Sequence, residues 1–371
     1  MKILFDLTPL FDHLTGIERF AMNISYSMIK AHPENEYILL FKNEIHERFK
    51  EVCGQDNVTT VILPAKNKLI FRQVTLLKAL KKNKADCYVF LSFVSPFFFR
   101  RRFLVNTLHD VSSWDCPGSR KWYLVLYSRL CIKKSLSVSD LVVTVSEFSR
   151  SRIESIFKTP ESRLCICYNG ISDVFQNAAE PSCDVKQKYD LPEKYILCLS
   201  TVEPRKNMSL LIKAFDSLKK KNLINSDLVI VGRKGWKLEQ AVGDASLLTD
   251  NVHFTGFVED SDLPFIYRNA NYFVFPSLYE GFGIPVIEAM SQGTVVVSSD
   301  ATSLPEVAGD AAVYFESNSL QALEASMVCV ENMSVAEKES YIRKGIAQSE
   351  RFNWDNEAGK LYGTLRDRMK G

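Results

Sequence analysis

Short apolar runs alternate with amphipathic segments along most of this chain. The runs are rich in β-branched and aromatic residues, as buried strands are, and the segments between them repeat their apolar residues at helical spacing. Strands that alternate with helices form parallel sheets covered on both faces, so the pattern predicts an α/β protein with doubly wound sheets. The predicted strands are 3–7, 37–41, 58–63, 87–91, 104–110, 140–146, 164–168, 195–200, 227–231, 252–257, 272–275, 294–298 and 312–315.

The alternation pauses once, near the middle of the chain. Residues 176–190 have no clear period and are predicted to be a linker. Because 371 residues also exceed one ordinary core, we predict an N-terminal Rossmann-like domain at 1–175 and a C-terminal one at 191–350. The last segment, 351–371, has a helical period and is predicted to form a terminal helix.

One strand-to-helix loop, within 271–293, carries a distinctive polar pattern. The amides of Phe282, Gly283 and Ile284 lie at the predicted helix start, where N–H groups lack an intrahelical partner, and glycine lets a ligand approach the backbone. Glu280 and Glu288 flank these donors as acceptors, which suits a polyhydroxyl ligand such as a sugar or a ribose. An ordinary β–α connection, with one surface glutamate and one glutamate favoured by the helix dipole, explains the pattern equally well.

A second loop, 201–207, follows the first predicted strand of the second half. Its neighbouring cations, Arg205 and Lys206, lie where a diphosphate would be clamped, with arginine offering a fork and lysine a point charge. A solvated basic turn is the alternative, but the position at a strand end favours the phosphate interpretation. Gly232, which begins the run 232–235 after another strand, could line the same crevice, although a P-loop spacing is missing.

Two positions in the first half are candidates for ligand contact. Gly16 stands at a strand-to-helix turn, where a phosphate can meet a helix N-terminus, although any tight turn uses glycine. His109 and Asp110 end a predicted strand, and ligands bind at such ends in open α/β sheets. A lone histidine is more often structural, so His109 needs support from elsewhere.

The net charge of +2 is unevenly distributed. Residues 60–152 carry 17 Lys and Arg against 5 Asp and Glu, and 119–138 is amphipathic with a basic face. Three phenylalanines beside three arginines within 94–103 suit a membrane interface or an anionic lipid head, and a core strand end followed by a basic turn is the alternative. The predicted membrane contacts are Phe97, Phe98, Phe99, Arg100, Arg101 and Arg102.

Composition excludes several classes of protein. No apolar run reaches the roughly 20 residues of a membrane span, and the N-terminus resembles a first strand more than a signal peptide. The nine cysteines show neither disulfide nor zinc spacing, which indicates a reducing, cytoplasmic compartment. Asp262 of an Asp-x-Asp pair and Ser303 of a capping-box pattern each precede a helix and are expected to cap it.

The pattern Glu280-x7-Glu288 resembles the signature of retaining glycosyltransferases with the GT-B fold, and the chain is most similar to family 4, the glycosyl transferases group 1 of bacterial polysaccharide and O-antigen assembly. Matching motifs are EPRKN at 203–207, Gly232, Gly256, LPEVAG at 304–309, FNWDNEA at 352–358, HD at 109–110 and VSEFSR at 145–150. The matches cover nearly the whole chain in the family's order. They are more specific in the second half.

The resemblance implies two Rossmann-like domains with a cleft between them and a terminal helix that crosses back to the first. Arg205 and Lys206 would neutralise the donor diphosphate, and Glu288 would hold the ribose. Glu280 and the 282–284 amides would hold the transferred sugar, which His109 would also touch. Gly16 would admit the diphosphate, but many relatives carry two glycines there, which puts this contact in doubt. Neither a metal nor a cofactor is expected.

These features predict a cytoplasmic, retaining hexosyltransferase at the inner face of the cell membrane. It would move a sugar, mannose being favoured by family prevalence, from a nucleotide diphosphate to a growing, lipid-linked glycan. A synthase of the same fold with a soluble acceptor is one alternative, and a non-catalytic nucleotide-sugar-binding subunit is another. No nucleic acid partner is expected.

Overall fold

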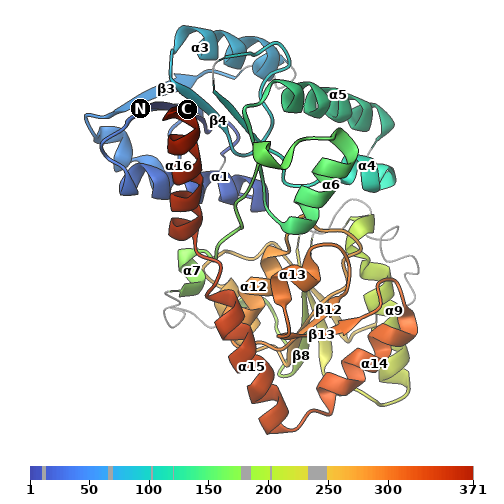
Figure 1. Cartoon of the computed structure of the whole chain (residues 1–371). Helices are drawn as coiled ribbons and strands as arrows, with labels where there is room; N and C mark the ends of the chain where they lie inside the picture. Colours follow the sequence, from blue (N-terminus) through green and yellow to red (C-terminus); the bar gives the residue numbers. More distant parts are fainter. Residues whose placement is uncertain are drawn as a thin grey trace. The chain divides into compact units, whose positions relative to one another are not determined.

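The computed structural model describes residues 1–10, 14–65, 70–101, 103–119, 121–176, 185–200, 203–232 and 249–370. Within it the chain forms two compact units (Figure 1). Unit 1 comprises Met1–Gly170 and Asn353–Gly371, and unit 2 comprises Ile171–Phe352. Each is built on one parallel sheet, as the alternation of strands and helices predicts.

Unit 1 contains a seven-stranded sheet in the order β3-β2-β1-β4-β5-β6-β7. All its pairs are parallel, and β1 lies between β2 and β4, with Ile3 opposite Tyr37 on one side and Cys87 on the other. The strands are β1 (Lys2–Asp6), β2 (Glu36–Lys42), β3 (Val58–Leu63), β4 (Cys87–Phe90), β5 (Leu104–Thr107), β6 (Leu141–Thr144) and β7 (Leu164–Ile166).

The helices of unit 1 include the last helix of the chain. This helix, α16, packs against α1, where Phe20 meets Trp354 edge to face at 6.0 Å. The segment predicted as one helix over 70–82 begins as a π-helix, η3 (Phe71–Leu76). The α-helices are α1 (Gly16–Ala31), α3 (Leu77–Lys82), α4 (Ser112–Asp115), α5 (Trp122–Val138), α6 (Glu147–Phe157) and α16 (Trp354–Lys370).

Unit 2 contains a six-stranded parallel sheet in the order β10-β9-β8-β11-β12-β13. Its strands are β8 (Tyr195–Leu199), β9 (Asp227–Val231), β10 (Val252–Gly256), β11 (Tyr272–Phe275), β12 (Val296–Ser299) and β13 (Ala312–Phe315). Its helices are α7 (Asp173–Gln176), α8 (Val185–Lys188), η6 (Pro204–Lys206, 3₁₀), α9 (Met208–Lys220), α11 (Leu263–Arg268), α12 (Ile284–Ser291), α13 (Leu304–Ala308), α14 (Leu320–Glu331) and α15 (Val335–Ser349).

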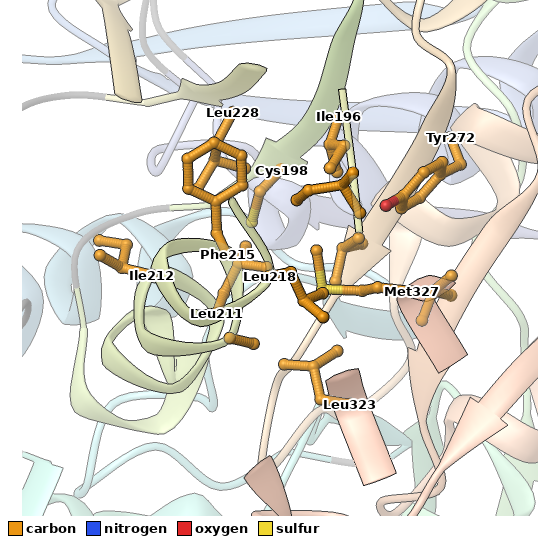
Figure 2. Packing of buried hydrophobic residues seen from close by; sticks show 14 of the residues in the cluster. Ile196, Cys198, Leu211, Ile212, Phe215, Leu218, Leu228, Tyr272, Leu323 and Met327 are labelled. Carbon is orange, nitrogen blue, oxygen red and sulfur yellow. The ribbon is translucent and has the colours of Figure 1, made fainter. Parts of the chain in front are cut away.

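A continuous apolar core holds one face of the unit 2 sheet to its helices (Figure 2). Leu211 and Phe215 of α9 lie against Cys198 of β8, and Leu323 and Met327 of α14 close the cluster. Burying an aliphatic or aromatic side chain contributes roughly 1.5–3 kcal/mol. This packing gives the loops at the strand ends a rigid base.

The strand order places one switch point in each sheet. In unit 1 the chain runs outward from β1 to β2 and β3, then returns to β4 on the other side of β1. In unit 2 it runs outward from β8 to β9 and β10, then returns to β11 beside β8. Loops diverge at the carboxyl ends of such neighbouring strands, and ligands bind there in open α/β sheets. The candidate residues after β8 and β11 therefore come together, although 74 positions separate Lys206 from Glu280.

Candidate active site

The loops that follow β8 and β11 are joined along their backbones. The amide of Leu278 donates to the carbonyl oxygen of Arg205 at 2.7 Å, and Oγ of Ser277 lies 3.2 Å from the same oxygen. Asn207, which ends η6, has a φ of +54° and turns the chain into α9. These contacts fix Arg205 and Lys206 beside the loop that carries Glu280.

Glu280 is the centre of a buried ionic cluster. Its Oε1 lies 2.5 Å from Nζ of Lys206, and its Oε2 lies 3.3 Å from Nη1 of Arg205. The hydroxyl of Ser277 donates to Oε1 at 2.6 Å. Arg205 also donates from Nη1 to the carbonyl of Tyr279 and from Nε to the carboxylate of Glu203, at 3.0 and 2.8 Å. One carboxylate thus holds both predicted cations in place.

Electrostatics keep this carboxylate ionised although only 8% of Glu280 is exposed. Burial raises the pKa of a carboxyl group because it disfavours the charged form. The charges of Lys206 and Arg205 more than offset burial here, so the pKa of Glu280 lies below its ordinary value. Arg205, Lys206 and Glu280 together carry one net positive charge, and the half-exposed carboxylate of Glu203 beside Arg205 balances it.

The start of α12 lies next to this cluster in the chain. Gly283 precedes the helix with a φ of +111°, a left-handed conformation that favours glycine. A Cβ at this position would come 2.7 Å from Cδ2 of Leu304, so the Leu304 side chain would have to shift. Pro285 is the second residue of the helix, where its missing N–H costs no intrahelical hydrogen bond. The 282–284 amides are at the N-terminal end of α12, where they can meet negative charge.

Three hydroxyl side chains support the Glu280 loop, and of these the sequence singled out only Ser303, for a different role. Ser277 contacts its carboxylate, Thr302 Oγ1 accepts from its amide at 3.0 Å, and Ser303 Oγ donates to its carbonyl at 3.1 Å. Ser303 also donates to the carbonyl of Phe282 at 2.9 Å and makes no cap hydrogen bond to α13. The predicted capping role of Ser303 is wrong, because two loop carbonyls take its hydroxyl.

Glu288 lies farther along α12, and only 7% of it is exposed. Its Oε2 accepts a hydrogen bond from the hydroxyl of Tyr267 in α11 at 3.1 Å. Tyr267 is itself fully buried and packs against Phe175 and Phe273. The side chain of Glu288 is thus held from within unit 2 by a residue with no recognisable sequence signal.

The remaining candidates of unit 2 have mixed outcomes. Gly232 follows β9 and donates its amide to the carbonyl of Gly256 at 3.0 Å, while 233–235 lie outside the described residues. Asp262 precedes α11 without capping it. Its carboxylate accepts instead from Lys188 Nζ at 2.7 Å and Tyr189 Oη at 2.8 Å, so the expected cap is wrong.

His109 and the start of α1 lie close together in unit 1. Phe20 of α1 packs edge-on against the His109 ring at 5.0 Å. Gly16 is the exposed first residue of α1, and Glu18 accepts from the amide of Thr15 at 3.1 Å. Thr15 and Glu18 thus form a capping box at the start of α1.

The hydrogen bond of His109 defines its tautomer. Nε2 lies 2.8 Å from the carbonyl oxygen of Leu91, at the end of β4. A carbonyl only accepts, so Nε2 carries the hydrogen and Nδ1 is the accepting nitrogen. Burial lowers the pKa of His109, which keeps the ring neutral at neutral pH.

The predicted membrane segment divides into two kinds of side chain. Phe99 is 2% exposed and packs against Tyr88 and Phe90, so its predicted membrane contact is wrong: the core of unit 1 holds it. Phe97 is half-buried, Phe98 is 75% exposed, and Arg100 and Arg101 are exposed. Arg102 lies outside the described residues. Among the helices that are described, none has the length and apolar character to cross a membrane.

Two family models match this chain. The model described as glycosyl transferases group 1 matches residues 183–347, and the model described as glycosyltransferase family 4 matches residues 15–174. The chain belongs to the family 4 glycosyltransferases, and both the predicted family and the predicted fold are confirmed.

Among curated proteins, the chain is similar to O-antigen chain mannosyltransferase B of Escherichia coli. The two are 31% identical over 96% of this chain and 97% of that protein. O-antigen chain mannosyltransferase RfbU of Salmonella typhimurium is 29% identical over 67% of this chain and 65% of its own length.

Solved structures share the fold of the whole chain. Sucrose-phosphate synthase from Thermosynechococcus elongatus has a TM-score of 0.75 at 18% identity and covers 99% of both chains. WaaG, a glycosyltransferase involved in lipopolysaccharide biosynthesis, has a TM-score of 0.72 at 17% identity, over 97% of this chain and 98% of its own. At these identities the likeness concerns the GT-B fold alone.

Proposed function

We propose that this protein is a retaining, metal-independent mannosyltransferase. In this proposal it moves mannose from a nucleotide diphosphate donor to a growing, lipid-linked polysaccharide. Its likeness to O-antigen chain mannosyltransferases over nearly its whole length supports the sugar and the acceptor class. The observation that carries the donor assignment is the half-buried pair of cations held by the buried carboxylate of Glu280 at the switch point of unit 2.

In the proposed mechanism, Arg205 and Lys206 bind the donor diphosphate. Negative charge grows on this group as the bond to the sugar breaks, and a fixed positive charge stabilises that state more than the ground state. Because Lys206 and Arg205 are already oriented by Glu280, little reorganisation is needed at that moment. Two cations thus supply the charge compensation, so the mechanism needs no metal ion. The N-terminus of α12 adds its dipole nearby.

The two glutamates have separate proposed roles. Glu280, with the 282–284 amides, holds hydroxyls of the mannose, and Glu288 holds the ribose. An ion-paired carboxylate is a weak nucleophile, so we propose that Glu280 positions the sugar without bonding to its anomeric carbon. Retention then follows from attack on the same face through an ion-pair-like state. Tyr267 would position Glu288 through its hydrogen bond.

Unit 1 contributes His109 and Gly16 in this proposal. The neutral ring of His109 has Nδ1 as its accepting nitrogen, which suits a hydrogen bond from a sugar hydroxyl. Gly16, at the exposed start of α1, admits the diphosphate to a helix N-terminus. We also propose that the protein works at the inner face of the membrane, where a lipid-linked acceptor lies.

The test is transfer of mannose from GDP-mannose to isolated lipid-linked glycan. Lys206→Ala and Glu288→Ala should each lower kcat/KM by roughly 10²–10³. Lys219→Ala is a matched control, because Lys219 is also a half-buried lysine in an ion pair, with Asp227, away from the cluster. Full activity of both variants would remove the donor-site proposal.

Three further readouts test the finer parts of the proposal. The anomeric configuration of the product, read by NMR, tests retention, and activity that persists in EDTA tests metal independence. Transfer to a soluble sugar phosphate in preference to the glycan would favour a synthase. Donor binding with neither transfer nor donor hydrolysis would favour a binding subunit.

A further inference from the structure

The outer face of α5 exposes a cluster of large apolar side chains. Trp122 is 76% exposed, and the four other members of the cluster are each about half exposed. At helical spacing these five residues share one side of the first half of α5. We call this cluster the α5 patch: Trp122, Tyr123, Leu126, Tyr127 and Leu130.

The exposed apolar face is not the face that holds α5 to unit 1. Val125, Ile132 and Leu136 are buried, and Ile132 and Leu136 belong to a core cluster with Val142 of β6. A surface helix usually needs one apolar stripe for its core, with polar residues opposite. A second apolar face that reaches solvent marks an interaction surface.

The α5 patch continues onto a neighbouring loop. The side chain of Gln73 in η3 donates to the hydroxyl of Tyr127 at 3.1 Å and accepts from the amide of Phe97 at 3.0 Å. These bonds bring together α5, η3 and the loop that follows β4. That loop carries the exposed ring of Phe98. Val74 of η3 is exposed as well, but it lines a hollow with side chains of β3 and α3, so the apolar surface consists of α5 and this loop with Gln73 bonded to both.

The charge around the α5 patch has one sign. Helix α5 contains no Asp or Glu, and its second half carries the exposed side chains of Lys133 and Lys134. Arg100 and Arg101 are exposed in the loop of Phe98. Tryptophan and tyrosine favour the boundary between headgroups and acyl chains, and lysine and arginine attract anionic headgroups.

We infer that the α5 patch inserts into the headgroup region of an anionic lipid bilayer, with α5 lying along the surface. This inference rests on the proposed function in one respect, since a membrane-borne acceptor requires an enzyme at the membrane. The sequence predicted a membrane contact at residues 97–102, whereas this inference places the main contact on α5. Phe98, Arg100 and Arg101 lie at the border of that contact. Figure 1 shows α5 at the edge of unit 1.

Vesicle flotation tests the inference with the whole chain. Vesicles of phosphatidylethanolamine with phosphatidylglycerol should bind the protein, and phosphatidylcholine vesicles should bind it far less. The triple variant Trp122→Ser/Leu126→Ser/Leu130→Ser should bind roughly tenfold or more weakly, since three apolar side chains no longer leave water. Lys133→Gln/Lys134→Gln should weaken binding and reduce its salt dependence.

A matched control removes exposed apolar side chains from unit 2. Leu223→Ser/Leu320→Ser/Val335→Ser should leave vesicle binding unchanged. Equal losses in both triple variants, or no binding by the native protein, would overturn the inference. Sedimentation without lipid checks self-association: a native dimer that the α5 variant converts to a monomer would assign the patch to a second copy and overturn it too.

Tryptophan fluorescence reports directly whether Trp122 enters the bilayer, and its first measurement uses the native protein. Addition of anionic vesicles should shift the emission of the native protein to the blue, and brominated lipids should quench it. Trp236 lies outside the described residues, so the measurement is made in a Trp236→Phe background. There Trp122→Phe should lose both effects, because Trp354 is buried and Trp114 is half-buried. An unchanged shift in Trp122→Phe would contradict insertion of α5.

The outcomes separate this inference from the proposed function. Donor hydrolysis and transfer to a short water-soluble acceptor should be unchanged in the α5 triple variant, while transfer to lipid-linked glycan in vesicles falls. Vesicle binding without any sugar transfer would instead leave the α5 inference standing and refute the proposed activity.

Discussion

Replacement of Lys206 by methionine keeps the apolar stem and removes one charge from the Glu280 cluster. Nζ of Lys206 is 2.5 Å from the carboxylate, and Glu280 is almost fully buried. Removing one partner of a buried ion pair costs about 3–5 kcal/mol when the other is left uncompensated. Arg205 at 3.3 Å and Ser277 at 2.6 Å remain, so we expect a loss of about 2–3 kcal/mol.

The loss should depend on pH with a definite sign. The pKa of Glu280 lies below its ordinary value of 4.5 in the native protein. A carboxyl with a lowered pKa stabilises the fold above its unfolded pKa, and that contribution disappears as pH falls through the folded pKa. In Lys206→Met the charge of Lys206 no longer offsets the effect of burial, so the pKa of Glu280 should rise. The free energies of unfolding of the native protein and of Lys206→Met should therefore differ most near pH 7 and converge below about pH 4.5.

Urea unfolding followed by circular dichroism, from pH 4 to pH 7.5, measures this difference. Lys219→Met is the control, because its partner Asp227 also accepts from Asn251 and His253 and lies outside the cluster. A difference between Lys206→Met and the native protein that stays constant across this range would refute an ionised, cation-paired Glu280.

Three other substitutions test the supports of the candidate site. Gly283→Ala should destabilise the protein by about 1–3 kcal/mol and abolish transfer, because its φ is +111° and a Cβ would meet Leu304; an unchanged melting temperature would contradict this. Ser303→Ala should cost about 1–2 kcal/mol and lower kcat, since two loop carbonyls lose their donor, and equal kcat values would count against a positioning role. The lowered pKa of His109 makes the fold lose stability as pH falls below about 6.5, the unfolded value. His109→Gln, which can still donate to the carbonyl of Leu91, should lack this loss. If the urea midpoints of the native protein and of His109→Gln change in parallel from pH 5 to pH 8, this prediction is wrong.

Much of the fold could be predicted because its signals are local. The four apolar residues of the run 272–275 are enough to predict a buried strand, and β11 has the same bounds as that run. Pro285 and Gly293 are local signals for the two ends of α12, because proline suits a first turn and Gly293 adopts a φ of +71° after the last. The Glu280-x7-Glu288 pattern likewise lay within one loop and helix, so the family could be recognised from it.

Errors arose where a residue had partners distant in sequence. Ser303 and Asp262 stand at helix starts and have the right side chains for caps, yet loop carbonyls and Lys188 bind them instead. Phe98 and Phe99 are identical neighbours in sequence, but one is exposed and the other lies in the core. Local spacing could not distinguish these outcomes, because the competing partner lay outside the window.

The amino-acid sequence by itself determined the type and order of the elements, the two-sheet α/β class and the motif of the family, since each depends on side chains within a few residues of one another. Only the tertiary structure decided that Lys206, Arg205 and Ser277 share the carboxylate of Glu280, that Tyr267 holds Glu288 and that α5 has a second apolar face. Strand order and register set these contacts. They bring distant loops together through the packing of whole sheets, which no short stretch of sequence encodes.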